Sequence, residues 1–151
     1  MKPKVQACLG QLIVSCQAYE DTPLYGAETM KKMVQSAMLG GAQAVRCCWP
    51  QDIRAARSLS EKLIIIGINK VMPKGEKKLD DVFITPTFEK AREVVEAGAD
   101  ILDVNVGLPE IDEQEMMIRA VKAVQSVCDL PLQLDSTRAD VLEAGLRVYN
   151  G

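Results

Sequence analysis

The chain has 151 residues, and 48% of them are hydrophobic. This is enough for one domain with its own core and too little for two domains of ordinary size. The net charge of −3, with basic and acidic residues interspersed, argues against nucleic acid as a partner. No apolar run approaches the roughly 20 residues that cross a bilayer, and the start MKPKVQACLGQLIV lacks a signal-peptide pattern. We therefore expect a soluble, cytoplasmic protein that binds neither nucleic acid nor a membrane.

The chain contains five cysteines and no histidine. Without histidine, Ser-His and Cys-His nucleophile pairs and the usual zinc sites are excluded, and Lys, Asp, Glu and Tyr remain for proton transfer. Cys47 and Cys48 are adjacent and could be taken for a redox or metal pair. Neighbours on a strand point to opposite faces, so we expect them to be moderately buried residues at a strand end. The sequence predicts no metal site.

Short apolar runs alternate with segments of helical period, which is typical of a βα repeat with parallel strands. Strands are predicted at 12–16, 42–46, 63–68, 100–106 and 130–135, and helices near 26–39, 50–60, 87–97, 110–127 and 138–149. In the third helix, Thr87 is expected to cap the amino terminus and Gly98 the carboxyl terminus. Residues 71–81 are polar and rich in Lys, which predicts a mobile loop.

Five βα units in series fit either a doubly wound sheet or part of a barrel. The first strand is not followed by the G-x-G-x-x-G of a dinucleotide-binding fold, which favours the barrel. A complete (β/α)8 barrel takes about 250 residues and eight strands. We therefore predict an α/β chain that forms a single domain, a partial (β/α)8 TIM barrel of about five βα units.

One polar residue stands at or near the end of each predicted strand: Gln17, Arg46, Lys70, Asn105 and Asp135. In a barrel, these ends form the mouth that carries the chemistry. A desolvated lysine can act as a base or hold an anion, so Lys70 is the strongest candidate, with an exposed loop lysine as the alternative. Arg46 offers paired donors for a carboxylate or phosphate, or else forms a salt bridge with a nearby acid.

Four segments resemble the N-acetylmannosamine-6-phosphate 2-epimerase family over about residues 10–102. They read LIVSCQAYEDTPLYGAETM, GGAQAVRCCWPQDI, IIGINKVMP and DVFITPTFEKAREVVEAGADI. The resemblance implies a TIM-barrel isomerase that moves a proton beside the carbonyl of an open-chain sugar phosphate, with no metal or organic cofactor. It also implies that Lys70 is the catalytic lysine and that Gln17 and Arg46 contact the substrate. Asp135 lies about where that family has a substrate-binding aspartate.

From AGADIL onward the pattern changes. The segments ILDVNVGLPEIDEQEMM and LPLQLDSTRADVLEAGLRVYNG resemble the pterin-binding methyltransferase domain of corrinoid enzymes and methionine synthases, over about residues 92–151. This resemblance implies methyltetrahydrofolate and a corrinoid as substrates, with Asp103, Asn105 and Asp135 at the pterin. Alternatively, Asp135 belongs to a helix cap together with Ser136 and Thr137. The chain is thus epimerase-like up to about residue 97 and pterin-binding-like from about residue 98.

Three functional hypotheses remain open. The first is an epimerase of low or no activity, because the acidic partner and phosphate loops of that family come from later strands. The second is a fragment of a methyltetrahydrofolate-dependent methyltransferase. The third is an inactive piece of a barrel that self-associates into a homo-oligomer through its open edges, since unpaired strands and exposed apolar surface favour association.

Overall fold

The computed structural model describes residues 2–71, 83–85, 87–107 and 111–151. Its centre is a parallel sheet whose strands pair in chain order: β1 (Ile13–Cys16), β2 (Ala44–Cys48), β3 (Ile64–Ile68), β6 (Ile101–Asn105) and β7 (Leu132–Asp135). A doubly wound sheet reverses its strand order at a switch point, and this sheet does not. The order is that of a barrel wall, which confirms the predicted partial barrel.

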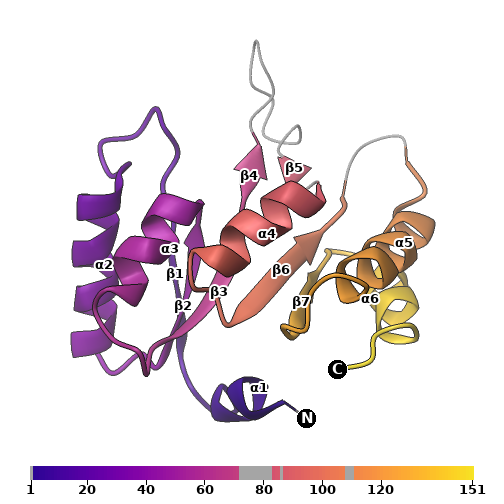
Figure 1. Ribbon diagram of the computed structural model, residues 1–151, viewed down its shortest axis with the longest axis horizontal. Helices are drawn as coiled ribbons and strands as arrows, with labels where there is room; N and C mark the ends of the chain where they lie inside the picture. Colours follow the sequence, from indigo (N-terminus) through magenta and orange to yellow (C-terminus); the bar gives the residue numbers. More distant parts are fainter. Residues whose placement is uncertain (1, 72–82, 86, 108–110) are drawn as a thin grey trace.

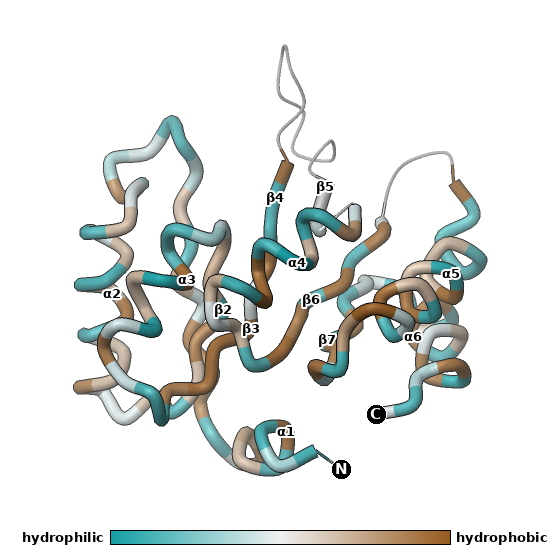
Figure 2. The backbone as a smooth tube through the Cα atoms, viewed as in Figure 1, coloured by the Kyte–Doolittle hydropathy of each residue, from teal (hydrophilic) through white to brown (hydrophobic). Residues whose placement is uncertain are grey.

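Helices follow the strands and cover one face of the sheet (Figure 1). They are α2 (Ala27–Leu39), α3 (Pro50–Arg57), α4 (Phe88–Glu96), α5 (Glu113–Gln125) and α6 (Ala139–Leu146). The central strands are mostly apolar, while the helices carry both polar and apolar residues (Figure 2). Every strand and helix predicted from the sequence is present, with ends that differ by a few residues. Beyond Val71, the predicted mobile loop lies outside the described residues.

The alternation of side chains along each strand separates two environments. On the helix side, Val45, Ile65 and Leu102 belong to the main hydrophobic core. On the inner side, a smaller cluster forms near the amino-terminal ends of the strands; it consists of Ala44, Ile64, Ile66 and Ile101. The carboxyl-terminal half of the inner side carries the polar residues described below.

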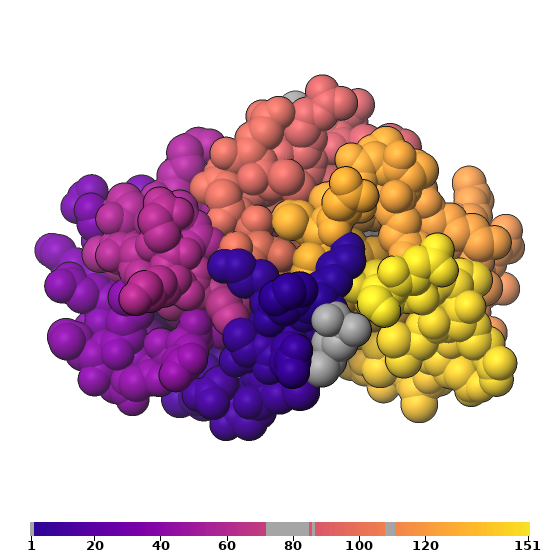
Figure 3. All heavy atoms as spheres, turned by 60° about the horizontal axis from the view of Figure 1, so that its bottom comes forward, coloured from indigo at the N-terminus to yellow at the C-terminus, as the bar shows by residue number. Residues whose placement is uncertain are grey.

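Three short elements were not predicted. Helix α1 (Pro3–Ala7) lies across the amino-terminal ends of the strands (Figure 3), where Val5 and Cys8 pack on the inner cluster and Lys4 pairs with Asp100 at 3.2 Å. Strands β4 (Lys70–Val71) and β5 (Phe83–Ile84) pair antiparallel beyond the carboxyl end of β3. Elements this short contain too few residues to show a periodicity. Their stability comes from the residues that they pack against.

The ends of α4 are as predicted. The Thr87 hydroxyl accepts a hydrogen bond from the Lys90 backbone N–H at 3.3 Å, and Gly98 adopts a left-handed φ of 101° just after the helix. Ala91 and Val94 are buried against the sheet. The polar cap therefore defines the start of α4, the apolar stripe its buried face and the glycine its end.

The prediction for Cys47 and Cys48 was half right. Their side chains do lie on opposite faces, with Cys47 in the main core and Cys48 beside Trp49 and Ile68. However, both are fully buried, because β2 runs two residues further than expected. Burial raises the pKa of the Cys48 thiol to about 12 and that of Cys47 further still, so both thiols stay protonated.

The described residues contain neither a candidate membrane-spanning helix nor a candidate metal cluster. None of the helices in this part of the chain is long and apolar enough to cross a membrane. Among the same residues, no group of three or more His, Cys, Asp or Glu side chains is arranged to hold a metal ion.

Candidate active site

The predicted polar residues come to the same end of the sheet. Gln17 directly follows β1, and Asn105 and Asp135 are the last residues of β6 and β7. Arg46 lies two residues before the end of β2, and Lys70 begins β4 just beyond β3. Because all five main strands are parallel, their carboxyl ends form one mouth.

Arg46 is the centre of a polar cluster on the inner face. Its side chain crosses β3 to reach the two strands beyond, where Nε donates to Asp103 Oδ2 at 2.9 Å and Nη2 donates to Asp135 Oδ2 at 2.8 Å. Gln133 Nε2 donates to the same oxygen of Asp103 at 2.7 Å. The salt bridge considered for Arg46 is therefore present, and it is formed with two acids at once.

Burial and charge act against each other in this cluster. Asp103 has no exposed surface, and desolvation raises its pKa to about 6, although the hydrogen bond and charge of Arg46 and the charge of Lys70 act to lower it. Burial alone would lower the pKa of Arg46, but the two aspartates outweigh it and raise that pKa. Arg46 is therefore a permanent cation, and Asp103 is a carboxyl group that can change its protonation near neutral pH.

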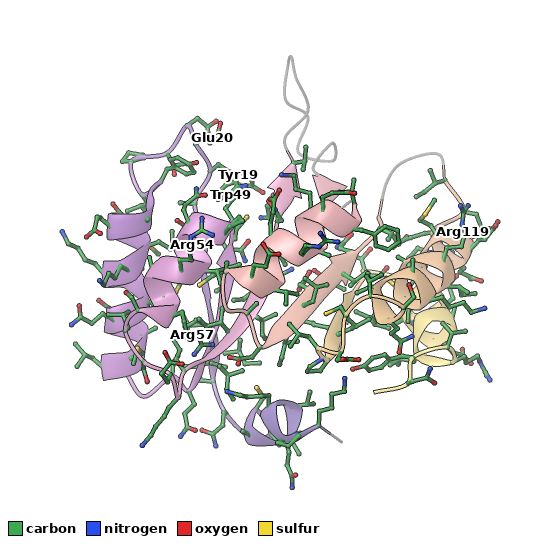
Figure 4. All side chains as sticks on the ribbon, viewed as in Figure 1. Tyr19, Glu20, Trp49, Arg54, Arg57 and Arg119 are labelled. Atoms are coloured by element: carbon green, nitrogen blue, oxygen red, sulfur yellow. The ribbon has the colours of Figure 1, made fainter. Side chains whose placement is uncertain are left out.

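Lys70 is held in place by aromatic neighbours. Its Nζ lies 3.3 Å from the Tyr19 hydroxyl and 4.8 Å from the centre of the Tyr19 ring. The Trp49 indole N–H donates to the Lys70 carbonyl at 2.9 Å, and the Trp49 backbone N–H donates to Ile68 at 2.9 Å. Tyr19 and Trp49 lie toward the carboxyl ends of the strands (Figure 4). Lys70 is partly buried and is contacted by residues that follow β1 and β2, unlike a free loop lysine.

Gln17 and Asn105 make local contacts only. Gln17 Nε2 donates to the Ser15 hydroxyl at 2.7 Å, and its Oε1 is buried with no partner among the described residues. Asn105 Oδ1 accepts from the Gly107 backbone N–H at 2.9 Å, which stabilises the turn after β6. Neither side chain joins the Arg46 cluster.

Asp135 does not cap a helix in this structure. The N-cap position of α6 is Arg138, and Ser136 instead donates to Glu113 at 2.6 Å. Asp135 is 37% exposed and lies beside Asn105 in the register of β6 and β7. Its free surface faces the mouth, where a ligand could reach it.

Two residues of the site were not singled out from the sequence. Gln133 precedes Asp135 by two positions, so strand alternation puts both on the inner face, and this signal was available. Tyr19 lies in the loop after β1, and no periodicity connects it to Lys70, which is 51 residues away. Only the tertiary structure brings those two together.

The strand order, the helices on one face and the polar residues at the carboxyl ends place the chain in the barrel class of α/β proteins. Comparison with known proteins identifies relatives within that class. A Listeria monocytogenes protein assigned as an N-acetylmannosamine-6-phosphate 2-epimerase is 47% identical over 95 residues, which is 62% of this chain and 38% of that protein. A Synechococcus elongatus protein of the same assignment is 30% identical over 138 residues, which is 91% of this chain and 56% of that protein.

A solved structure agrees with these relatives. The N-acetylmannosamine-6-phosphate 2-epimerase from Clostridium perfringens superposes with a TM-score of 0.62 at 27% identity, covering 91% of this chain and 56% of that one. Residues 78–151 also match the family described as pterin binding enzyme. Both resemblances seen in the motifs are thus confirmed. The chain spans 38% to 56% of the length of the relatives and of the solved structure named here.

Proposed function

We propose that the mouth is the Lys70 side of an amino-sugar-phosphate 2-epimerase site. The observation that carries this is the placement of Lys70 and the Arg46–Asp135 pair at one end of the sheet, within the stretch similar to the epimerases. N-acetylmannosamine 6-phosphate is the proposed substrate, and Gln17, Arg46 and Asp135 are its proposed contacts. The reaction needs no metal or organic cofactor.

In this proposal Lys70, with its amine uncharged, removes the proton from the carbon beside the carbonyl of the open-chain sugar. Epimerisation then requires an acid that returns a proton to the opposite face of that carbon. We assign this role to Asp135, which would first have to take a proton from solvent, whereas in the structure its Oδ2 accepts a hydrogen bond from Arg46 Nη2 at 2.8 Å. Releasing that bond opposes catalysis, so turnover is expected to be slow.

Slow proton exchange is measured most directly in heavy water. We expect the 151-residue chain to introduce deuterium beside the carbonyl of N-acetylmannosamine 6-phosphate, detected by mass spectrometry. Lys70→Ala should abolish this incorporation, because it removes the base. Lys62→Ala, which changes an exposed lysine at the opposite end of β3, should leave it unchanged. Equal incorporation by the Lys70→Ala protein would refute the proposal.

A second candidate function is pterin binding. It is supported by the family match over residues 78–151 and by the pairing of Asn105 with Asp135 on neighbouring strands, which puts an amide beside a carboxylate at the mouth. Binding of methyltetrahydrofolate, followed by calorimetry, should be lost in Asp135→Asn and retained in Asp129→Asn, an exposed control. Binding that survives Asp135→Asn would argue against this function.

We further infer that the chain is a single domain that associates with a second copy through the edges of its sheet. Among the described residues, β1 and β7 are each paired on one side only. Leu12 and Ile13, at the β1 edge, are 65% and 41% exposed. Pairing β7 of one copy with β1 of another would satisfy both edges and cover this apolar surface.

A further inference from the structure

Asp103 is implied as a pterin contact by the second resemblance, but it lies where a ligand cannot touch it in this structure. It has no exposed surface, and the hydroxyl of Thr85, just after β5, donates to its backbone carbonyl at 3.3 Å. Its carboxylate oxygen Oδ2 accepts from Arg46 and from Gln133. A buried acid that bonds to a partly exposed arginine acts on a ligand only through that arginine.

The contacts fix the arginine at two points. Arg46 is bonded through Nε to Asp103 on β6 and through Nη2 to Asp135 on β7. A single bond would let the guanidinium rotate, whereas two bonds to neighbouring strands define its plane. Gln133 pairs with Asp103 in the strand register and donates to the same oxygen, which in turn fixes the carboxylate.

The two aspartates differ in their freedom. Asp135 is 37% exposed and can exchange its bond to Arg46 for a bond to a ligand, while Asp103 cannot leave. If Asp135 turned away, Asp103 would still hold Arg46 and balance its charge. This division of roles matters for either proposed ligand, because both proposals use Asp135 at the mouth.

The partners also come from different parts of the chain. Arg46 lies in the epimerase-like part, whereas Asp103, Gln133 and Asp135 lie in the part matched by the pterin binding enzymes. We propose that Asp103 is a positioning residue that fixes Arg46 across the mouth, so that Asp135 is free to exchange Arg46 for a ligand. This inference rests on the proposed role of the mouth as a ligand site.

The test reads the arginine directly by nitrogen NMR of the full chain, without a ligand. In the wild type, the Nε–H signal of Arg46, assigned by its loss in Arg46→Lys, should exchange slowly with solvent. In Asp103→Asn the exchange should become about tenfold faster or more, as expected for loss of a charge-assisted hydrogen bond. Asp135→Asn should leave the Nε–H slow, because that bond is made by Nη2. Asp140→Asn, which alters an aspartate paired with Arg138, is the control and should have no effect on Arg46.

A wild-type titration keeps the test valid if Asp103→Asn does not fold. As the pH falls through about 6, Asp103 gains a proton and the Arg46 Nε–H signal should shift with that midpoint. If the Arg46 Nε–H signal changes neither in Asp103→Asn nor with pH, the inference is wrong. If the Arg46 signal responds as expected but separate assays show that the protein binds neither the sugar phosphate nor methyltetrahydrofolate, the result counts against the proposed functions and not against the role of Asp103.

Discussion

At the residue scale, Asp52 is an acid buried at a cost. It lies in the first turn of α3 with no exposed surface, and neither carboxylate oxygen has a hydrogen-bond partner among the described residues. Burial raises its pKa from 3.8 to about 6. The folded state therefore binds this proton more tightly than the unfolded state, and stability falls as the pH rises from about 4 to about 6.

We expect Asp52→Asn to remove this loss. At pH 7 the variant should be more stable than the wild type by on the order of 1–3 kcal/mol, and near pH 4 the two should differ little. Urea unfolding at both pH values measures the difference. Asp103 titrates in the same range but is present in both proteins, so its contribution cancels. A stability difference that does not change with pH would contradict the explanation.

At the element scale, α4 depends on its cap. Thr87 accepts the Lys90 backbone N–H, and the helix that it starts buries Ala91 and Val94. Thr87→Ala should lower the free energy of unfolding by about 0.5–2 kcal/mol, measured by urea unfolding. Thr137→Ala is the matched control, because Thr137 is exposed and the structure records no hydrogen bond for its side chain. Equal losses in the two variants would show that the cap is unimportant.

At the scale of the whole molecule, the open edges of the sheet predict association. The melting temperature should rise with protein concentration, because association stabilises the folded chain by mass action. Ile13→Lys places a charge at the β1 edge and should give a monomer in sedimentation, with a melting temperature independent of concentration. Phe88→Lys, at an exposed apolar residue of α4, which packs on the central strands β3 and β6, should still associate. A wild-type chain that is monomeric at every concentration would contradict the model of paired edges.

The sequence predicted the main elements because their signals are local. Buried parallel strands appear as apolar runs such as Ile64–Ile68, and the helices show an apolar stripe, with a cap at Thr87 and a glycine at Gly98. Parallel order then places Gln17, Arg46, Lys70, Asn105 and Asp135 at one end without further information. Helix α1 and the β4–β5 pair escaped prediction, because neither has a stripe or a run long enough to show a period.

What the sequence by itself determined is the βα repeat, the common end of the polar residues and the two resemblances that meet near AGADIL. What only the tertiary structure decided is which of those residues act together. Arg46 bonds to acids 57 and 89 residues away, Lys70 contacts Tyr19 from 51 residues away, and Asn105 turns to its own loop. The reason is physical: strand alternation fixes the face that a side chain points to, but a long side chain can cross a neighbouring strand, and its partner depends on charge and burial in three dimensions.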